Sequence, residues 1–529
     1  RGSVFNNAHE TCTTWDPGSY TGKLNNWLTG VYTELPDELN RGALAEGNSR
    51  SSGWTWRNNL EFRQAFKEKH FLSIYVGHEV SEYKSNSNYV KYPEYDPEKG
   101  LMGVPDIDGV EDVKRKILNL LDGLSESRNR SVSFFVSGSY SFLDRYVVAG
   151  SIRMDGADII GTANRFSPLW NASFKYNVYE EGFMKKISWL DELAFRLSYG
   201  YTGSIDKNAL PFGVMTFMST DEYFGYDIPT YIQPKNPSVK WQKKEDRSVG
   251  VDFALLNRRI RGTVNYYNNV TRNLLDTKNL PISVGVSSIK YNSSSVRNYG
   301  WEFSMNSQVL RTKELFWKVD FNVGMNRSKV IKTYYKDISE IPKGYDKTTP
   351  VEGASTNAWF GYRFAGIDPR TGHTLAFVDN SKREEPIGFQ REDGRWVLDM
   401  DDVVNKDRES IKENLGDSYP TVNGGFRTNL SWKDFTFDAN FTFMVGHKIT
   451  AAYYATSAGG VVSAASQNVL KKEATRWRKP GDITDIPVYS SGGEYSSLNS
   501  EWYEVILESG DFLKCTSISF GYRVPSLIC

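Results

Sequence analysis

The chain has 529 residues, 14% of them aromatic, and its 64 Lys and Arg residues are balanced by 64 Asp and Glu residues. Zero net charge excludes the basic footprint of a nucleic-acid-binding protein, and three cysteines (Cys12, Cys515 and Cys529) argue against a disulfide framework or a cysteine zinc site. The sequence has no run of the roughly 18 apolar residues that a transmembrane helix needs, but a β-barrel would escape this test because its lumen hides half of each strand.

Alternation of apolar and polar residues predicts β-strands along most of the chain. In the stretch 131–155, Val132, Phe134 and Val136 alternate with serines, and the pattern resumes after a break at 143–145. This predicts a hairpin of two long strands, each with one apolar and one polar face. Further period-two runs lie at 58–66, 71–83, 193–201, 248–255, 260–266, 301–306, 317–325, 434–445 and 517–522. Most are near the ~10 residues that a tilted membrane strand needs.

The expected connections are either very short or very long. The short ones are 143–145, 256–259, 311–315 and 432–434, and the long ones are 203–247, 271–297, 327–421 and 448–510. Tight turns on one rim and long loops on the other are typical of outer-membrane barrels, whose short rim faces the periplasm. Segment 175–190 is a connection of intermediate length, at a position where the alternation of short and long connections predicts a short turn.

The polar faces are rich in Ser, Thr, Asn and Gly rather than in Lys and Glu. This favours a lumen lined by hydrogen-bonding groups, with the apolar faces directed at lipid. Two alternatives stay open: a soluble β-protein that binds or cleaves carbohydrate, and a passive porin or adhesin barrel. The barrel interpretation requires apolar side chains that no second layer of protein covers.

The candidate substrate-binding residues are the loop tryptophans Trp359, Trp396, Trp477 and Trp502. An indole ring can hold a sugar or peptide, or anchor the chain at an interface. Anchoring is the simpler interpretation for most of them, and a loop buttress is the simpler one for Trp477.

Other chemistry is weakly indicated. Segment 398–409 (LDMDDVVNKDRE) carries alternating carboxylates that could bind calcium, but it lacks the turn glycine of an EF-hand loop, so a solvated acidic loop is simpler. The five histidines show no metal-ligand spacing, and no nucleophile elbow or phosphate-binding loop occurs. The sequence predicts a protein that is not an enzyme and has no cofactor.

An ordered set of motifs, from about residue 59 onward, resembles the SusC-like (RagA-like) branch of TonB-dependent outer-membrane transporters. The motifs are YSFLDRYVVAGSIRMDGAD, NPSVKWQKKEDRSVGVDFALLNRRIRGTVNYYNNVTRNLL, VRNYGWEFSMNSQ, GIDPRTG, YPTVNGGFRTNLSWKDFTFDANFTFMVGHK, RWRKPGDITDIP and FLKCTSISFGYRVP. Relatives often have an Asp-rich loop with a glycine at segment 398–409. This chain lacks that glycine, which argues further against a metal there.

The resemblance implies an all-β fold, a large antiparallel transmembrane barrel of about 22 strands around an N-terminal plug domain, with a TonB box ahead of the plug. It also implies a SusD-like surface lipoprotein as a lid, and TonB-powered import of oligosaccharides or peptides across the cell outer membrane. Residues 1–529 are expected to be part of the barrel domain, without the plug, the first strands and the last strand. The polar faces show no dominant charge, which slightly favours a neutral glycan as the cargo.

Overall fold

The structure, a computed structural model, describes residues 2–15, 42–96, 100–101, 122–158, 165–204, 213–220, 227–233, 236, 239–280, 283, 288–340, 350–381, 383–400, 410–450, 475–488, 504 and 507–524. The chain divides into two compact units, one made of residues 1–63, 73–138 and 151–168 and the other of the remainder. Among the described residues, no helix is long and apolar enough to cross a membrane.

The first unit contains most of the long strands β1, β2, β3, β5 and β6, which follow one another in this order in the sheet. The bounds are β1 Gly2–Trp15, β2 Gly42–Phe66, β3 His70–Asp96, β5 Asp122–Phe142, β6 Tyr146–Ala157 and β7 Phe166–Asn177, and the short β4 (Gly100–Leu101) pairs with β3. Strand β1 pairs antiparallel with β2 from Gly2↔Trp56 to Trp15↔Ala43. Several strands exceed the alternating segments that predicted them, and β1 and β7 were not predicted.

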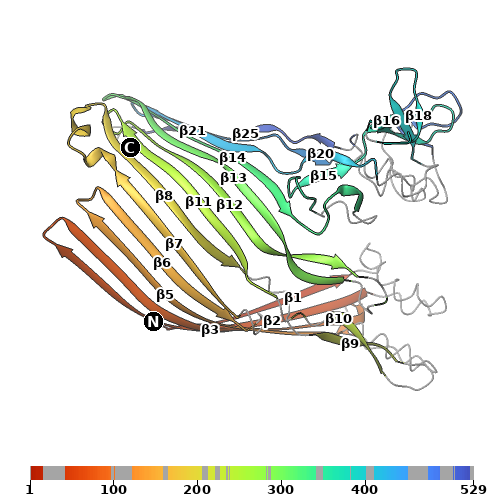
Figure 1. The fold of residues 1–529 in the computed structure, drawn as a ribbon, viewed down its shortest axis with the longest axis horizontal. Helices are drawn as coiled ribbons and strands as arrows, with labels where there is room; N and C mark the ends of the chain where they lie inside the picture. The colour runs from red at the N-terminus through yellow and green to blue at the C-terminus, as the bar shows by residue number, and fades with distance from the viewer. Residues whose placement is uncertain are drawn as a thin grey trace. The chain divides into compact units, whose positions relative to one another are not determined.

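In the second unit the strand order is β7-β8-β11-β12-β13-β14-β21-β22-β25 (Figure 1). Each neighbouring pair is antiparallel. The bounds are β8 Leu190–Ser204, β11 Gln242–Leu255, β12 Ile260–Asn279, β13 Ser288–Arg311, β14 Leu315–Lys332, β21 Val422–Trp432, β22 Phe435–Val445 and β25 Phe512–Tyr522.

Smaller sheets lie in the long connections. Strands β9 (Val214–Thr220) and β10 (Asp227–Gln233) form one pair, β15 (Ala358–Gly361) and β20 (Glu413–Asp417) a second, and β23 (Lys448–Thr450) and β24 (Leu507–Ser509) a third. A four-stranded sheet has the order β16-β17-β19-β18, with β16 Phe364–Ile367, β17 Thr374–Val378, β18 Phe389–Gln390 and β19 Trp396–Asp399. The 3-10 turn η6 (Ile338–Glu340) precedes them.

The four short connections are confirmed as tight turns. The turn between β5 and β6 has positive φ at Leu143 (56°) and Asp144 (53°), and the Arg145 N–H donates to the Phe142 carbonyl (3.0 Å). Left-handed φ values suit two-residue hairpin turns because their twist matches that of the strands. They hold neighbouring strands in a fixed register.

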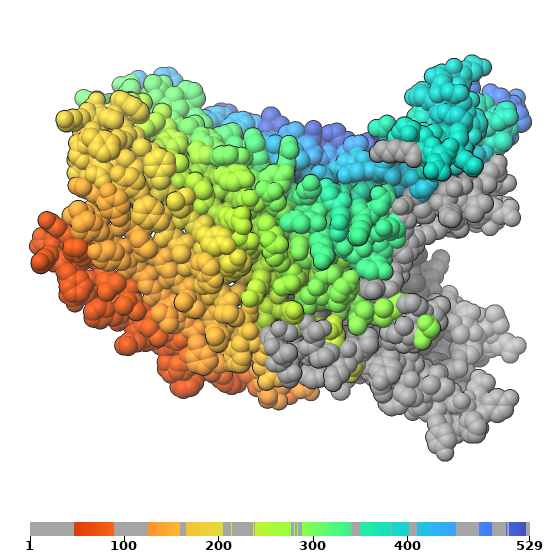
Figure 2. Space-filling model, viewed as in Figure 1, coloured from red at the N-terminus to blue at the C-terminus, as the bar shows by residue number. Residues whose placement is uncertain are grey.

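The medium connection is confirmed too, and it is a compact knob. It contains the 3-10 turns η3 (Val178–Glu180) and η4 (Met184–Lys186), and Val178 and Met184 pack with Leu190 at the start of β8. Figure 2 shows this knob in yellow, at the opposite end of the second unit from the loop sheets in teal.

The prediction of one long loop, 271–297, is wrong. Strand β12 continues to Asn279 and β13 begins at Ser288, so that the connection between them is 280–287. The pairing changes register after Thr271 and resumes at Leu274. The register shift and the polar residues beyond it remove the clean alternation by which the sequence would show a strand. The expected loop 327–421 likewise carries β15 to β20 and is not structureless.

The apolar faces are uncovered. Phe134 and Val148 are each 53% exposed, Trp301 is 54% exposed and Phe520 is 80% exposed. A soluble sandwich would bury such side chains between two sheets, whereas a membrane barrel turns them toward lipid. The described strands therefore have the uncovered apolar side chains that the barrel interpretation requires.

Candidate functional site

The polar face of the second unit carries a hydrogen-bonded ion pair across three strands. The Arg196 guanidinium of β8 donates to Asp252 of β11 (Nη2–Oδ1 2.9 Å) and to the hydroxyl of Thr263 of β12 (3.0 Å). The Thr263 hydroxyl in turn donates to Asp252 (2.8 Å). A Cβ at Gly250 would lie 3.1 Å from Arg196 Nη2 and 2.7 Å from the side-chain oxygen of Asn265, so glycine leaves room for this group.

Further pairs continue along the same face. Lys318 and Asp320 on β14 lie 2.7 Å apart, and Arg427 on β21 contacts Asp438 on β22 at 2.8 Å. A cavity of about 320 Å³ opens among Arg196, Thr263, Asn265, Glu302 and Asn322, with other residues of β13, β14 and β21. Because the charges of these pairs compensate each other, this part of the face offers several hydrogen bonds and little net field. That suits contact with a polar, weakly charged solute.

The loop sheet β16–β19 lies beyond the ends of β14 and β21 that are remote from the short turns (Figure 1). Its core contains Tyr362, Ala376, Val378, Leu398, Met400 and Ile411. The alternating residues of β17 and β19 supply this core from both strands, which pair from Leu375↔Asp399 to Val378↔Trp396. The loop sheet therefore has a hydrophobic core of its own.

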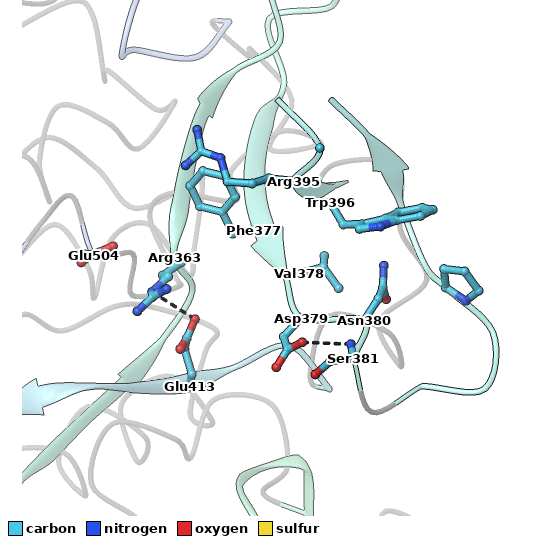
Figure 3. Close-up of a pocket in the computed structure, with 12 residues that line it drawn as sticks. Arg363, Phe377, Val378, Asp379, Asn380, Ser381, Arg395, Trp396, Glu413 and Glu504 are labelled. Carbon is cyan, nitrogen blue, oxygen red and sulfur yellow. Dashed lines mark hydrogen bonds and ion pairs between the residues drawn. The ribbon is translucent and has the colours of Figure 1, made fainter. Parts of the chain in front are cut away.

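A cavity of about 900 Å³ opens on this loop sheet. Figure 3 shows Phe377 and Trp396 with the polar side chains that follow β17. The lining residues are Arg363, Phe377, Val378, Asp379, Asn380, Ser381, Pro386, Gly394, Arg395, Trp396, Glu413 and Glu504. Aromatic rings beside carboxylates and an amide can stack on a sugar or a side chain and hydrogen-bond its polar groups.

Several contacts fix the cavity wall. The Arg395 guanidinium lies 4.5 Å from the centre of the Phe377 ring and pairs with Asp393 (2.6 Å). Hydrogen bonds from the Arg395 side chain and backbone hold the pKa of Asp393 below its ordinary value. Arg363 lies 3.4 Å from Glu413, and the Asn380 amide donates to the Ile387 carbonyl (3.1 Å).

The predicted tryptophans have different surroundings. Trp396 is half-buried and lines the loop cavity. The Trp359 indole N–H, on β15, donates to the Lys448 carbonyl (3.1 Å), which ties two loops together. Trp502 lies outside the described residues. Of the three that are described, Trp396 alone lines the cavity.

Trp477 belongs to a clasp between two of the sequence motifs. Its indole N–H donates to the Pro369 carbonyl (3.0 Å), which also accepts from the Gly481 N–H (2.8 Å). Gly372 has φ +79°, and a Cβ there would lie 2.6 Å from the Trp477 ring. The Val488 N–H donates to the Gly372 carbonyl (2.9 Å). The turn GIDPRTG and the segment RWRKPGDITDIP thus hold each other, with Trp477 as a buttress.

Most of the acidic segment 398–409 lies outside the described residues, which end at Met400 and resume at 410. Asp399 lies 3.0 Å from His373 Nδ1. In the described part of the chain, no three His, Cys, Asp or Glu side chains gather as a metal site.

Sequence reasoning did not single out Phe377, Arg395 or Glu413. A signal for part of the wall was present in REDGRW, since Asp-Gly favours a reversal of the chain. Gly394 has φ +81°, and its N–H donates to the Arg391 carbonyl (2.9 Å) between β18 and β19.

Comparison with known proteins gives a consistent result. Residues 5–443 match the family model described as "TonB dependent receptor-like, beta-barrel". TonB-dependent receptor P26 of Formosa agariphila is 23% identical over 499 residues, which is 91% of this chain and 48% of that protein. TonB-dependent receptor SusC of Bacteroides thetaiotaomicron is 25% identical over 419 residues, which is 76% of this chain and 38% of that protein.

A solved structure has the same fold. The RagAB peptide transporter matches 100% of this chain and 53% of the solved chain, with a TM-score of 0.78 at 21% identity. This chain spans about half or less of the length of these relatives.

Long antiparallel strands, uncovered apolar faces, a hydrogen-bonded polar face and tight turns opposite long loops define a transmembrane β-barrel of the outer membrane. The chain belongs to the TonB-dependent receptor-like β-barrel family, and its similarities lie with the SusC-like and RagA-like receptors.

Proposed function

We propose that the protein imports a bulky polar nutrient, an oligosaccharide or a peptide, across the outer membrane by TonB-dependent transport. Family membership supports this proposal, as do the sequence similarity to the TonB-dependent receptor SusC and the fold shared with a peptide transporter. In this proposal residues 1–529 belong to the barrel domain, and the plug domain belongs to another part of the protein.

The observation that carries the proposal is the placement of the loop cavity. It opens beyond the long-loop ends of the strands, which are the extracellular ends in outer-membrane barrels. Its rings and polar groups suit an extended polar ligand, and the paired charges of the lumen offer hydrogen bonds farther in. Capture therefore happens at the loops, and the lumen conducts the nutrient without covalent chemistry.

The proposal includes two partners. A SusD-like surface lipoprotein closes over the long loops and retains the nutrient, and TonB supplies energy from the inner membrane. The described loop sheet, with its own core, is a firm platform for such a lid.

The test is growth of the source organism on single oligosaccharides and on peptides as sole nutrient. Deletion of the gene for the full-length receptor should abolish growth on one class, and a receptor without its TonB-contacting segment should not restore it. Growth restored by that truncated receptor would exclude energised import and favour a passive porin.

A further inference from the structure

The outward face of the second unit changes from apolar to cationic along several strands. The cross-strand register places Leu197, Val249, Tyr266, Trp301 and Met325 on one row of this face, from β8 to β14. Toward the long loops, the next rows of the same face carry the residues that we name the rim cations. These are Lys243, Arg247, Arg272, Arg297, Arg327 and Lys329.

The rim cations outnumber the carboxylates around them. Among the described residues of these rows, Glu245 is the one carboxylate. It is 4% exposed, pairs with Arg247 and lies 3.7 Å from Arg272. Lys243, Arg297, Arg327 and Lys329 form no ion pair with any described carboxylate. They differ in this from the cations of the ion pairs described above for the polar face.

Like charges also face each other across strands. Lys243 is directly opposite Arg272, and Arg297 is directly opposite Lys329. Such cross-strand pairs are destabilising. In the second pair, Arg297 is held in place by other contacts: it lies 4.8 Å from the Tyr299 ring centre and donates a hydrogen bond to the Asn268 side-chain oxygen (2.9 Å). An anion between the cations would remove the repulsion.

The depth of the cations matches that of lipid headgroups. On β14 the outward residues run from Leu315 to Met325 without a charge, and Arg327 and Lys329 follow. Ten steps at about 3.3 Å, tilted by about 40°, give an apolar band of about 25 Å, the height typical of outer-membrane barrels. The next outward positions toward the long loops lie at the headgroups of the outer leaflet.

A cavity of about 360 Å³ opens at the same place. Tyr299, Arg327 and Lys329 line it, with the segment 353–355 and Asp417 on other sides. Two cations beside one recess can hold a phosphate group more firmly than isolated surface lysines can.

We propose that the rim cations form a binding surface for phosphate-bearing lipid headgroups of the outer leaflet. The headgroup phosphates neutralise the facing pairs Arg297–Lys329 and Lys243–Arg272, and the aromatic row below them contacts the start of the acyl region. This surface is independent of nutrient transport and fixes the height of the barrel in the membrane.

The test uses the full-length protein and the triple variant Arg297→Gln/Arg327→Gln/Lys329→Gln. Binding to lipid A in nanodiscs should weaken by at least about tenfold, since each Lys or Arg near an anionic surface contributes substantially. Co-purified phosphate-bearing lipid, measured by mass spectrometry, should fall in parallel. Arg297→Lys/Arg327→Lys keeps the charges and should keep the lipid.

The matched control removes three exposed lysines at the short-turn rim, in Lys185→Gln/Lys313→Gln/Lys433→Gln, and should bind lipid A as the parent does. Heat-dependent gel migration verifies that each variant is folded. Equal lipid A binding by the triple variant and the control would overturn the proposal. Competition by inorganic phosphate as effective as that by lipid A would overturn it too, because the ligand would then be free phosphate.

Discussion

At the residue scale, Trp396 is the predicted tryptophan for which we propose a role in ligand capture. It lines the loop cavity and also packs against the core of the loop sheet. Trp396→Leu keeps the apolar packing but removes the aromatic face, whereas Trp396→Phe keeps both. We expect nutrient affinity to fall about fivefold in the leucine variant, since stacking interactions of this kind contribute ~1 kcal/mol, and to change little in the phenylalanine variant.

Isothermal titration calorimetry of the full-length receptor measures that affinity. Trp359→Leu is the control, because the Trp359 indole ties two loops outside the cavity lining. Unchanged affinity in Trp396→Leu, with a folded barrel, would remove Trp396 from the binding site.

A second residue-scale prediction concerns pH and the clasp. Hydrogen bonds from the backbone N–H groups of Arg478 and Lys479 hold the pKa of Asp482 below 3.8. A depressed folded pKa means that the carboxylate stabilises the clasp at neutral pH. This stabilisation is lost as the pH falls through the folded pKa. We expect the protection factors of residues 476–488, which correct each exchange rate for the slower intrinsic exchange in acid, to fall below about pH 4.

Asp482→Asn removes the titrating group. The variant should exchange faster at neutral pH and show a flatter pH dependence. A pH profile identical to that of the parent would show that Asp482 does not hold the clasp.

At the scale of elements, the tight turns offer a stabilising change. Leu143 and Asp144 both have positive φ, a conformation that costs non-glycine residues energy. Asn-Gly suits a two-residue hairpin turn with two positive φ values. Leu143→Asn/Asp144→Gly should therefore stabilise the barrel by roughly 1 kcal/mol, with the loss of the weak Ser141–Asp144 contact (3.3 Å) as a small offset.

The free energy of unfolding in urea, measured on the full-length protein in detergent, checks this prediction. Leu143→Ala, which cannot relieve the φ strain, should not stabilise. A lower stability for the Asn-Gly variant would mean that the Leu143 side chain contributes more than its strained backbone costs.

The elements also show where sequence reasoning works. Period-two alternation located β5, β6, β8, β11 and β14, because one face of each strand is apolar and the other polar. It failed for the outer parts of β12 and β13, where a register shift and polar residues above the membrane band remove the contrast. The loop sheet was missed for another reason: its strands of two to five residues are too short to show a period.

The candidate site was less predictable than the fold. Trp396 stood out as a loop tryptophan, but Phe377 and Glu413, which line the same cavity, lie on strands of two different sheets, and no local pattern shows that the fold brings them together. The rim cations were equally hidden, since each is one charge at a strand end. They become a surface because the register aligns the four strands β11, β12, β13 and β14.

At the scale of the whole molecule, the main claim is that the two faces of each strand meet different solvents. Val319 and Asn322 on β14 test it, because they differ by three positions and therefore lie on opposite faces. Val319 lies near the middle of the uncharged outward run from Leu315 to Met325, whereas Asn322 lines the polar cavity.

Val319→Arg places a charge near the centre of the hydrocarbon and should destabilise the folded barrel by about 2–4 kcal/mol. Asn322→Arg places the same charge in a hydrated lumen and should change stability by less than about 0.5 kcal/mol. Both are measured by urea unfolding of the full-length protein in lipid vesicles, where the hydrocarbon thickness is defined. Equal costs would mean that the apolar face of β14 meets water or protein instead of lipid, and the barrel assignment of these strands would then fail.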